Sequence, residues 1–196
     1  MNPNRRAEIA MRALLLASLV LAACASSMKP TRFTNPRIDF SFVERVAVLP
    51  FENLSTDQQA GFRATRLLVT ELLASGAVDV VEPGEVSAAL SRFPGRVTRP
   101  SIEQIVSLGK TLGVQAVIAG AVSQSEVLRS GAAGIPTVTL DAQMIETESG
   151  VIVWAATHTE KGSAFGAKVL GTQGEPIAVT TRRCVHRLLE TLVEEP

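Results

Sequence analysis

Residues 45–51 are Arg45-Val-Ala-Val-Leu-Pro-Phe51, a short apolar run that follows a single arginine. An unbroken run of this kind is typical of a strand that is buried on both faces of a sheet. Pro50 has no backbone N–H to donate to a neighbouring strand, so we expect the strand to end there. The segment therefore predicts a sheet with covering layers, and this decides the class of fold.

Helix and strand patterns alternate downstream of this strand. Ala64, Leu68 and Leu72 recur on one helical line, which predicts a helix up to about Ser75, and Gly76 is its expected C-cap. We also expect strands at 78–81, 116–124, 137–146 and 151–161. Helices are expected to start at Pro83 and at the capping-box pattern Ser101-Ile-Glu-Gln104, the second of them closed by Gly113, and a last helix is expected over 176–194. We expect a glycine-rich turn over 130–135 and a glycine-rich loop over 162–175.

The predicted order is β-α-β-α-α-β-β-β-α. It indicates an α/β fold with a single mixed sheet and flanking helices, in two or three layers. We assign residues 44–196 to this one domain.

The amino terminus has a different composition. Residues 1–12 contain Arg5, Arg6 and Arg12, and residues 13–23 are eleven residues without a charge. A membrane-spanning helix needs about 20 apolar residues, so this run is too short to be a permanent anchor. A basic start, a short apolar middle and small residues at the end are typical of a signal peptide.

The end of this segment, Leu21-Ala22-Ala23-Cys24, resembles the lipobox of bacterial lipoproteins. The resemblance implies cleavage before Cys24, diacylglycerol on its sulfur and an acylated amino group. Several acyl chains hold a protein to a membrane far longer than one chain does. Ala25 resembles the residue of the outer-membrane sorting class, so we expect lipid anchoring at the periplasmic face of the outer membrane. The alternative is an ordinary signal peptide followed by a coincidental cysteine.

These interpretations divide the chain into three parts. Residues 1–23 are the expected signal peptide, residues 24–43 a flexible tether without regular structure, and residues 44–196 the folded domain. Serine, threonine, asparagine and proline punctuate the tether.

Three motifs in the folded part resemble the TolB amino-terminal domain and its relatives, the secretion lipoprotein CsgG and the penicillin-binding-protein activator LpoB. They are Val46-Ala-Val-Leu-Pro-Phe-Glu-Asn-Leu54, Leu112-Gly-Val-Gln-Ala-Val-Ile-Ala-Gly120 and Met144-Ile-Glu-Thr-Glu-Ser-Gly-Val-Ile-Val-Trp154. The resemblance implies an α/β fold and a place in the cell envelope. It implies no catalytic residue, because these relatives act by binding and assembly. CsgG has two membrane-crossing hairpins, whereas this sequence predicts one strong hairpin, which is needed to finish the sheet. The tether is also shorter than the long arm of LpoB.

Composition and residue spacing argue against nucleic-acid binding and against a metal or cofactor site. The 19 basic and 19 acidic residues balance, and the aromatic residues are seven Phe and one Trp, so we expect no nucleic-acid surface. His158 and His186 lack a second ligand at metal spacing, so we expect neither a metal site nor a cofactor. Ser107 and Lys110 match the S-x-x-K motif of penicillin-binding enzymes. That chemistry also needs an S-D-N element and a larger two-part fold, so we expect both residues on the solvent-exposed face of a helix. Cys184 is expected to be a buried thiol and Trp154 a packing residue.

We therefore expect a non-enzymatic, lipid-anchored periplasmic protein that binds a protein partner in envelope assembly, secretion or cell-wall regulation. The second hypothesis is a subunit of a CsgG-like oligomeric export channel, and homo-oligomer formation is compatible with both. The third and weakest hypothesis is an enzyme, because no acid–base or nucleophile arrangement is evident.

Overall fold

The computed structural model describes residues 29–38, 40–94, 100–130, 133–163 and 174–193. Its elements in chain order are β1 (Thr31–Thr34), η1 (Phe40–Phe42), β2 (Arg45–Val48), β3 (Glu52–Asn53), α2 (Ala60–Ser75), β4 (Asp79–Val80), α3 (Pro83–Leu90), α4 (Ile102–Leu112), β5 (Ala116–Ser130), β6 (Ala133–Glu146), β7 (Ile152–Lys161) and α6 (Ile177–Val193).

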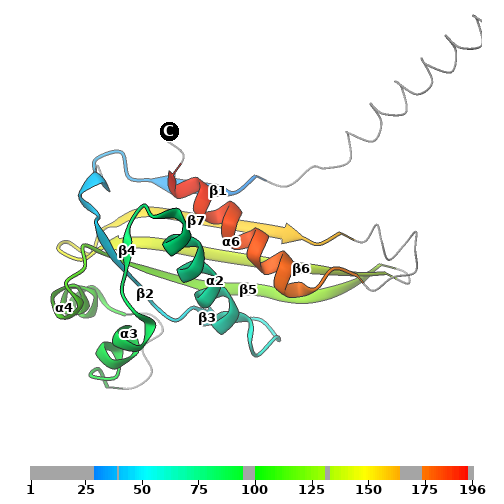
Figure 1. Ribbon diagram of the computed structural model, residues 1–196, viewed down its shortest axis with the longest axis horizontal. Coiled ribbons are helices and arrows are strands. Elements are labelled where there is room, and N and C mark those ends of the chain that lie inside the picture. The colour runs from blue at the N-terminus through cyan, green and yellow to red at the C-terminus, as the bar shows by residue number, and fades with distance from the viewer. Residues whose placement is uncertain (1–28, 39, 95–99, 131–132, 164–173, 194–196) are drawn as a thin grey trace, which may run out of the picture.

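The strands form one mixed sheet of seven strands. Its order is β1-β7-β6-β5-β2-β4, and β3 also pairs with β5 (Figure 1). β2 lies parallel to both β4 and β5, whereas β5, β6, β7 and β1 are antiparallel neighbours. The predicted mixed α/β fold is confirmed.

Helices cover the sheet on two sides, so the parallel part has three layers. The side chains of β2 alternate between two cores, with Val46 and Val48 packed in the core under α2 and α6. Ala47 belongs to the other core, which α3 and α4 close. The side chains of Val46, Ala47 and Val48 are at most 3% exposed, as expected for a strand buried on both faces. Figure 1 shows α2 and α6 side by side across one face of the sheet.

The predicted helix ends are confirmed. Gly76 and Gly113 cap α2 and α4 with φ of 63° and 62°, a left-handed conformation that costs other residues energy. Pro83 occupies the first turn of α3. In α4 the capping box is complete, because Ser101 Oγ accepts from Gln104 N and the Gln104 side chain accepts from Ser101 N.

The expected lack of regular structure between residues 25 and 43 is wrong in part. Thr31–Thr34 forms the edge strand β1, paired with β7 in a register that joins Thr31 to Thr157 and Thr34 to Trp154. Pro30 and Pro36 flank this strand, and prolines are tolerated at a sheet edge, where no hydrogen-bonding partner is lost. The domain therefore begins with residues that we assigned to the tether.

The hairpin of β5 and β6 is longer than predicted. The expected turn over 130–135 falls mostly within the strands, because β5 continues to Ser130 and β6 starts at Ala133. Pairing continues to the end, as Leu128 is opposite Ile135 and Arg129 opposite Gly134. Interstrand hydrogen bonds therefore override the local turn preference of the glycines.

Candidate functional site

The predicted lipidation site, Leu21, Ala22, Ala23 and Cys24, lies outside the described residues. Most of the glycine-rich segment 162–175 also lies outside them. Within the part that is described, no helix is both long enough and apolar enough to cross a membrane.

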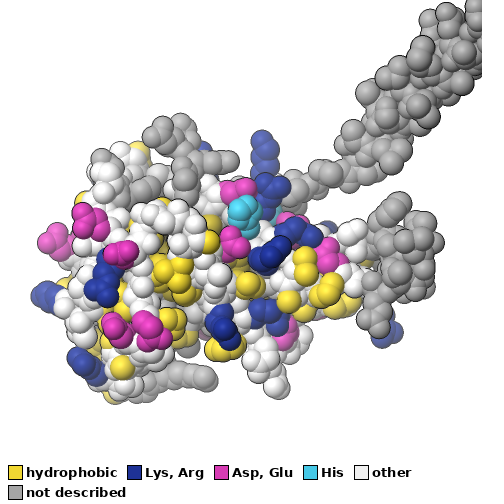
Figure 2. Space-filling view, in the orientation of Figure 1, with side chains coloured by type: hydrophobic (Ala, Val, Ile, Leu, Met, Phe, Trp, Pro, Cys, Tyr) yellow, Lys and Arg dark blue, Asp and Glu magenta, His cyan; other side chains and the backbone are white. Residues whose placement is uncertain are grey.

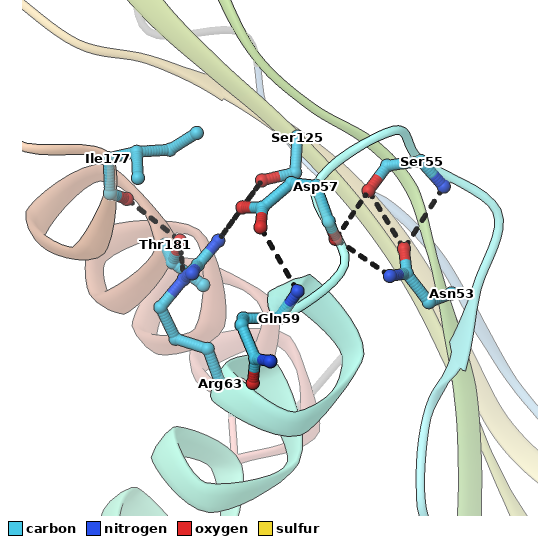
Figure 3. Close-up of polar contacts among 8 residues, drawn as sticks. All are labelled: Asn53, Ser55, Asp57, Gln59, Arg63, Ser125, Ile177 and Thr181. Atoms are coloured by element: carbon cyan, nitrogen blue, oxygen red, sulfur yellow. Dashed lines mark hydrogen bonds and ion pairs between the residues drawn. The ribbon is translucent and has the colours of Figure 1, made fainter.

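A polar cluster joins the loop before α2 to β5 and α6 (Figure 3). The guanidinium of Arg63 contacts the carboxylate of Asp57 through Nη2 and donates to Ser125 Oγ at 3.2 Å. Its Nε donates to Thr181 Oγ1 at 3.3 Å. Ser125 Oγ in turn donates to Asp57 Oδ2 at 3.0 Å, and Gln59 N donates to Asp57 Oδ1 at 3.1 Å.

The chemistry of this cluster is that of a structural anchor. Burial alone raises the pKa of the Asp57 carboxyl, but hydrogen bonds from Arg63, Ser125 and Gln59 outweigh it and leave the pKa below its ordinary value. Ser125 donates its proton to a carboxylate, and no histidine is among its hydrogen-bond partners in the described residues. The cluster therefore fixes the loop and the start of α2 to the sheet and to α6.

Sequence reasoning missed this cluster. Asp57 and Ser125 are 68 positions apart, and Arg63 and Thr181 are 118 apart. The only local signal is the Ser-Thr-Asp stretch before the helix, which is typical of helix starts.

His158 and Cys184 are buried between β7 and α6. His158 Nε2 lies 3.1 Å from Glu160 Oε2, and Glu160 Oε1 accepts from Arg183 Nε at 3.1 Å. The Cys184 thiol lies 3.4 Å from the carbonyl oxygen of His158, and its burial raises the pKa to about 12. The prediction that Cys184 is buried is confirmed, its lack of reactivity stays a prediction, and His158 is a packed side chain of the core.

The remaining candidate residues lie on three different elements, α4, β7 and α6. Ser107 and Lys110 are exposed on α4, as predicted. His186 lies on the surface of α6 with Glu71 and Glu190 as neighbours. Trp154 is fully buried, as predicted for a packing residue. Among the residues that the structure describes, no three His, Cys, Asp or Glu side chains are grouped so that they could hold a metal ion.

Two of the surface grooves lie along α2 and α6. The first, the basic groove, has a volume of about 530 Å³ and lies over the amino-terminal halves of the two helices. The second, the acidic groove, has a volume of about 740 Å³ and lies over their carboxyl-terminal halves. The basic groove is defined by Phe62, Arg66, Leu67, Ala178, Val179 and Arg182. The acidic groove is defined by Val43, Glu71, Leu72, Val78, Leu189 and Glu190.

No protein-family model and no curated protein matches the sequence. Solved structures share the fold. A PelC dodecamer from Paraburkholderia phytofirmans aligns with a TM-score of 0.57 at 19% identity, over 82% of this chain and 96% of that chain. Lipoprotein GNA1162 from Neisseria meningitidis aligns with a TM-score of 0.56 at 14% identity, over 78% of this chain and 99% of that chain.

The LpoB C-terminal domain from Escherichia coli aligns less closely, with a TM-score of 0.48 at 16% identity over 63% of this chain and 87% of that chain. The chain therefore has the mixed α/β fold of PelC and of a neisserial lipoprotein. At these identities the likeness concerns the fold alone. The predicted resemblance to TolB and CsgG stays a prediction.

Proposed function

We propose that this chain is a lipid-anchored envelope protein that acts by binding other proteins and performs no catalysis. The observation that carries the proposal is Leu21-Ala22-Ala23-Cys24 at the end of an uncharged run. A diacylated or triacylated Cys24 would keep the folded domain at the periplasmic face of the outer membrane. The fold shared with lipoprotein GNA1162 supports this role.

The surface of the domain supports a binding role over a catalytic one. Asp57 contacts Arg63, His158 contacts Glu160 and His186 contacts Glu71, and neither groove along α2 and α6 brings two of the three residues together. These grooves combine apolar floors with charged rims, a combination that suits protein contacts. The partner would belong to envelope assembly, secretion or cell-wall regulation.

The anchor is tested by replacing Cys24 and following the protein through membrane fractionation. We expect Cys24→Ala to leave the outer-membrane fraction, whereas Cys184→Ala, which changes the other cysteine, stays there with the parent protein. A Cys24→Ala protein that fractionates as the parent does would refute lipid anchoring.

Crosslinking in living cells, followed by identification of the captured protein, tests the binding role.

The second candidate function is a subunit of a CsgG-like oligomeric export channel. Two observations favour it: β5 and β6 extend past the neighbouring strand β2, and the similar PelC structure is a dodecamer. One observation weighs against it. Val127 and Leu128, 56% and 42% exposed, are adjacent in β5 and so point to opposite faces, and neither face of this arm is continuously apolar. The mass of the detergent-extracted protein separates the two functions, because a channel requires a ring of many copies.

A further inference from the structure

Helices α2 and α6 run in the same direction across one face of the sheet (Figure 1). Near their amino-terminal ends, Arg63 Nε donates to Thr181 Oγ1 at 3.3 Å. Further along, His186 Nδ1 lies 3.2 Å from Glu71 Oε2. Two parallel helices have their dipoles aligned, so partial positive charge collects at one end of this face and partial negative charge at the other.

The side chains have the same polarity as the dipoles. Arg66 and Arg182 line the basic groove, where both are exposed. Glu71 and Glu190 line the acidic groove, with His186 between them at 3.2 and 3.4 Å. Figure 2 shows basic side chains gathered over the amino-terminal parts of the two helices. Arg187 also contacts Glu190, so Glu71 is the less neutralised carboxylate.

The apolar surfaces of the two grooves are also complementary. Phe62 and Val179 are 63% and 38% exposed at the basic groove, and the guanidinium of Arg66 lies 5.5 Å from the centre of the Phe62 ring. The acidic groove offers a hollow floored by Leu72, Val78 and Leu189. One end of this face thus presents projecting apolar side chains with positive charge, and the other end presents an apolar hollow with negative charge.

We propose that a second copy of this chain binds across α2 and α6, related by a two-fold axis, so that the basic groove of each copy meets the acidic groove of the other. Both complementary halves lie on one face. A two-fold axis that lies in the plane of the contact, perpendicular to the two helices, brings the two faces together and pairs both halves at once. Such a contact is isologous and closes at two copies. Phe62 of each copy enters the hollow beside Leu72 of its partner, and Arg66 approaches Glu71.

This inference goes beyond the proposed function, because it assigns a partner to one face and does not require lipid on Cys24. The test uses the processed full chain in mild detergent, and sedimentation velocity measures the number of copies over a range of concentrations. One variant reverses the basic end with Arg66→Glu and Arg182→Glu. The other reverses the acidic end with Glu71→Lys and Glu190→Lys. Arg92→Glu with Arg129→Glu is the matched control, since both arginines are exposed away from this face.

We expect the parent protein and the control to form pairs. For each reversed variant alone, the dissociation constant of the pair should be at least about tenfold higher than for the parent protein, because like charges would then face each other. An equal mixture of the two reversed variants should form pairs again, since each then offers the charges that the other needs. Recovery in the mixture also shows that both variants are folded.

Three results would overturn the proposal. The first is a parent protein that stays a single chain at every concentration, which would leave this face to a different protein. The second is an assembly of more than two copies, such as a ring of twelve. The third is a pair that both reversed variants form as readily as the parent does.

Discussion

The indole Nε1 of Trp154 donates a hydrogen bond to Oγ1 of Thr191 at 3.2 Å, inside the contact between β7 and α6. Both residues are buried, and Thr191 Oγ1 also donates to the carbonyl oxygen of Leu188 at 2.7 Å. The pair holds the last helix on the antiparallel half of the sheet.

Removal of the acceptor tests this contact. In Thr191→Val the buried indole N–H loses its partner, and we expect the free energy of unfolding to fall by about 1–3 kcal/mol. Urea unfolding followed by circular dichroism measures the change. Adding Trp154→Phe, which removes the unsatisfied donor, should cost less than the sum of the two single changes. Strictly additive costs would contradict the hydrogen bond.

Gly109 of α4 is required because Thr147 packs directly against it. A Cβ at position 109 would lie 2.6 Å from Thr147 Oγ1 and closer still to the Thr147 Cβ. Thr147 is held in place by hydrogen bonds to the carbonyl oxygens of Val114 and Gln115. Alanine favours helices over glycine by about 1 kcal/mol, yet we expect Gly109→Ala to lower the melting temperature because of this overlap.

The exposed Ser107→Ala on the same helix is the control for Gly109→Ala, and its melting temperature should be unchanged or slightly higher. A Gly109→Ala protein that is as stable as the Ser107→Ala protein would show that α4 does not pack as described.

The carboxylate of Asp57 should make stability depend on pH. Its pKa is below the ordinary value of 3.8 in the folded protein, so its stabilising contribution is present above that value and is lost as the pH falls through the folded pKa. We expect the parent protein to lose more stability than Asp57→Asn between about pH 6 and about pH 3. Urea unfolding at both pH values measures this, and equal losses in the two proteins would contradict the role of Asp57.

Cys184 should be unreactive until the protein unfolds. Its thiol pKa of about 12 leaves almost no thiolate near about pH 8, and the side chain is fully buried. A thiol reagent should therefore label Cys184 only in denaturant. Rapid labelling of the native protein would contradict the burial of this residue.

Local chemistry predicted much of the fold. Helix ends depend on residues close by in the chain, here Gly76, Gly113 and the Ser101–Gln104 pair. The apolar run at 45–51 likewise predicts a buried strand from its own composition. Strand β1 was missed because its place depends on pairing with Trp154 to Thr157, far along the chain.

The polar features depended still more on distant contacts. Asp57 and Ser125 approach each other only when the loop before α2 folds over β5, and no local sequence pattern predicts that contact. The two grooves likewise require α2 and α6 to lie side by side. Sequence periodicity predicts each helix but not that they are neighbours.

The most direct test of the account is the mass spectrum of the processed protein isolated from membranes. We expect a polypeptide that begins at Cys24, lacks residues 1–23 and carries diacylglycerol on the sulfur and an acyl chain on the amino group. A polypeptide that retains residues 1–23, or one that begins at Cys24 with a free thiol, would contradict it.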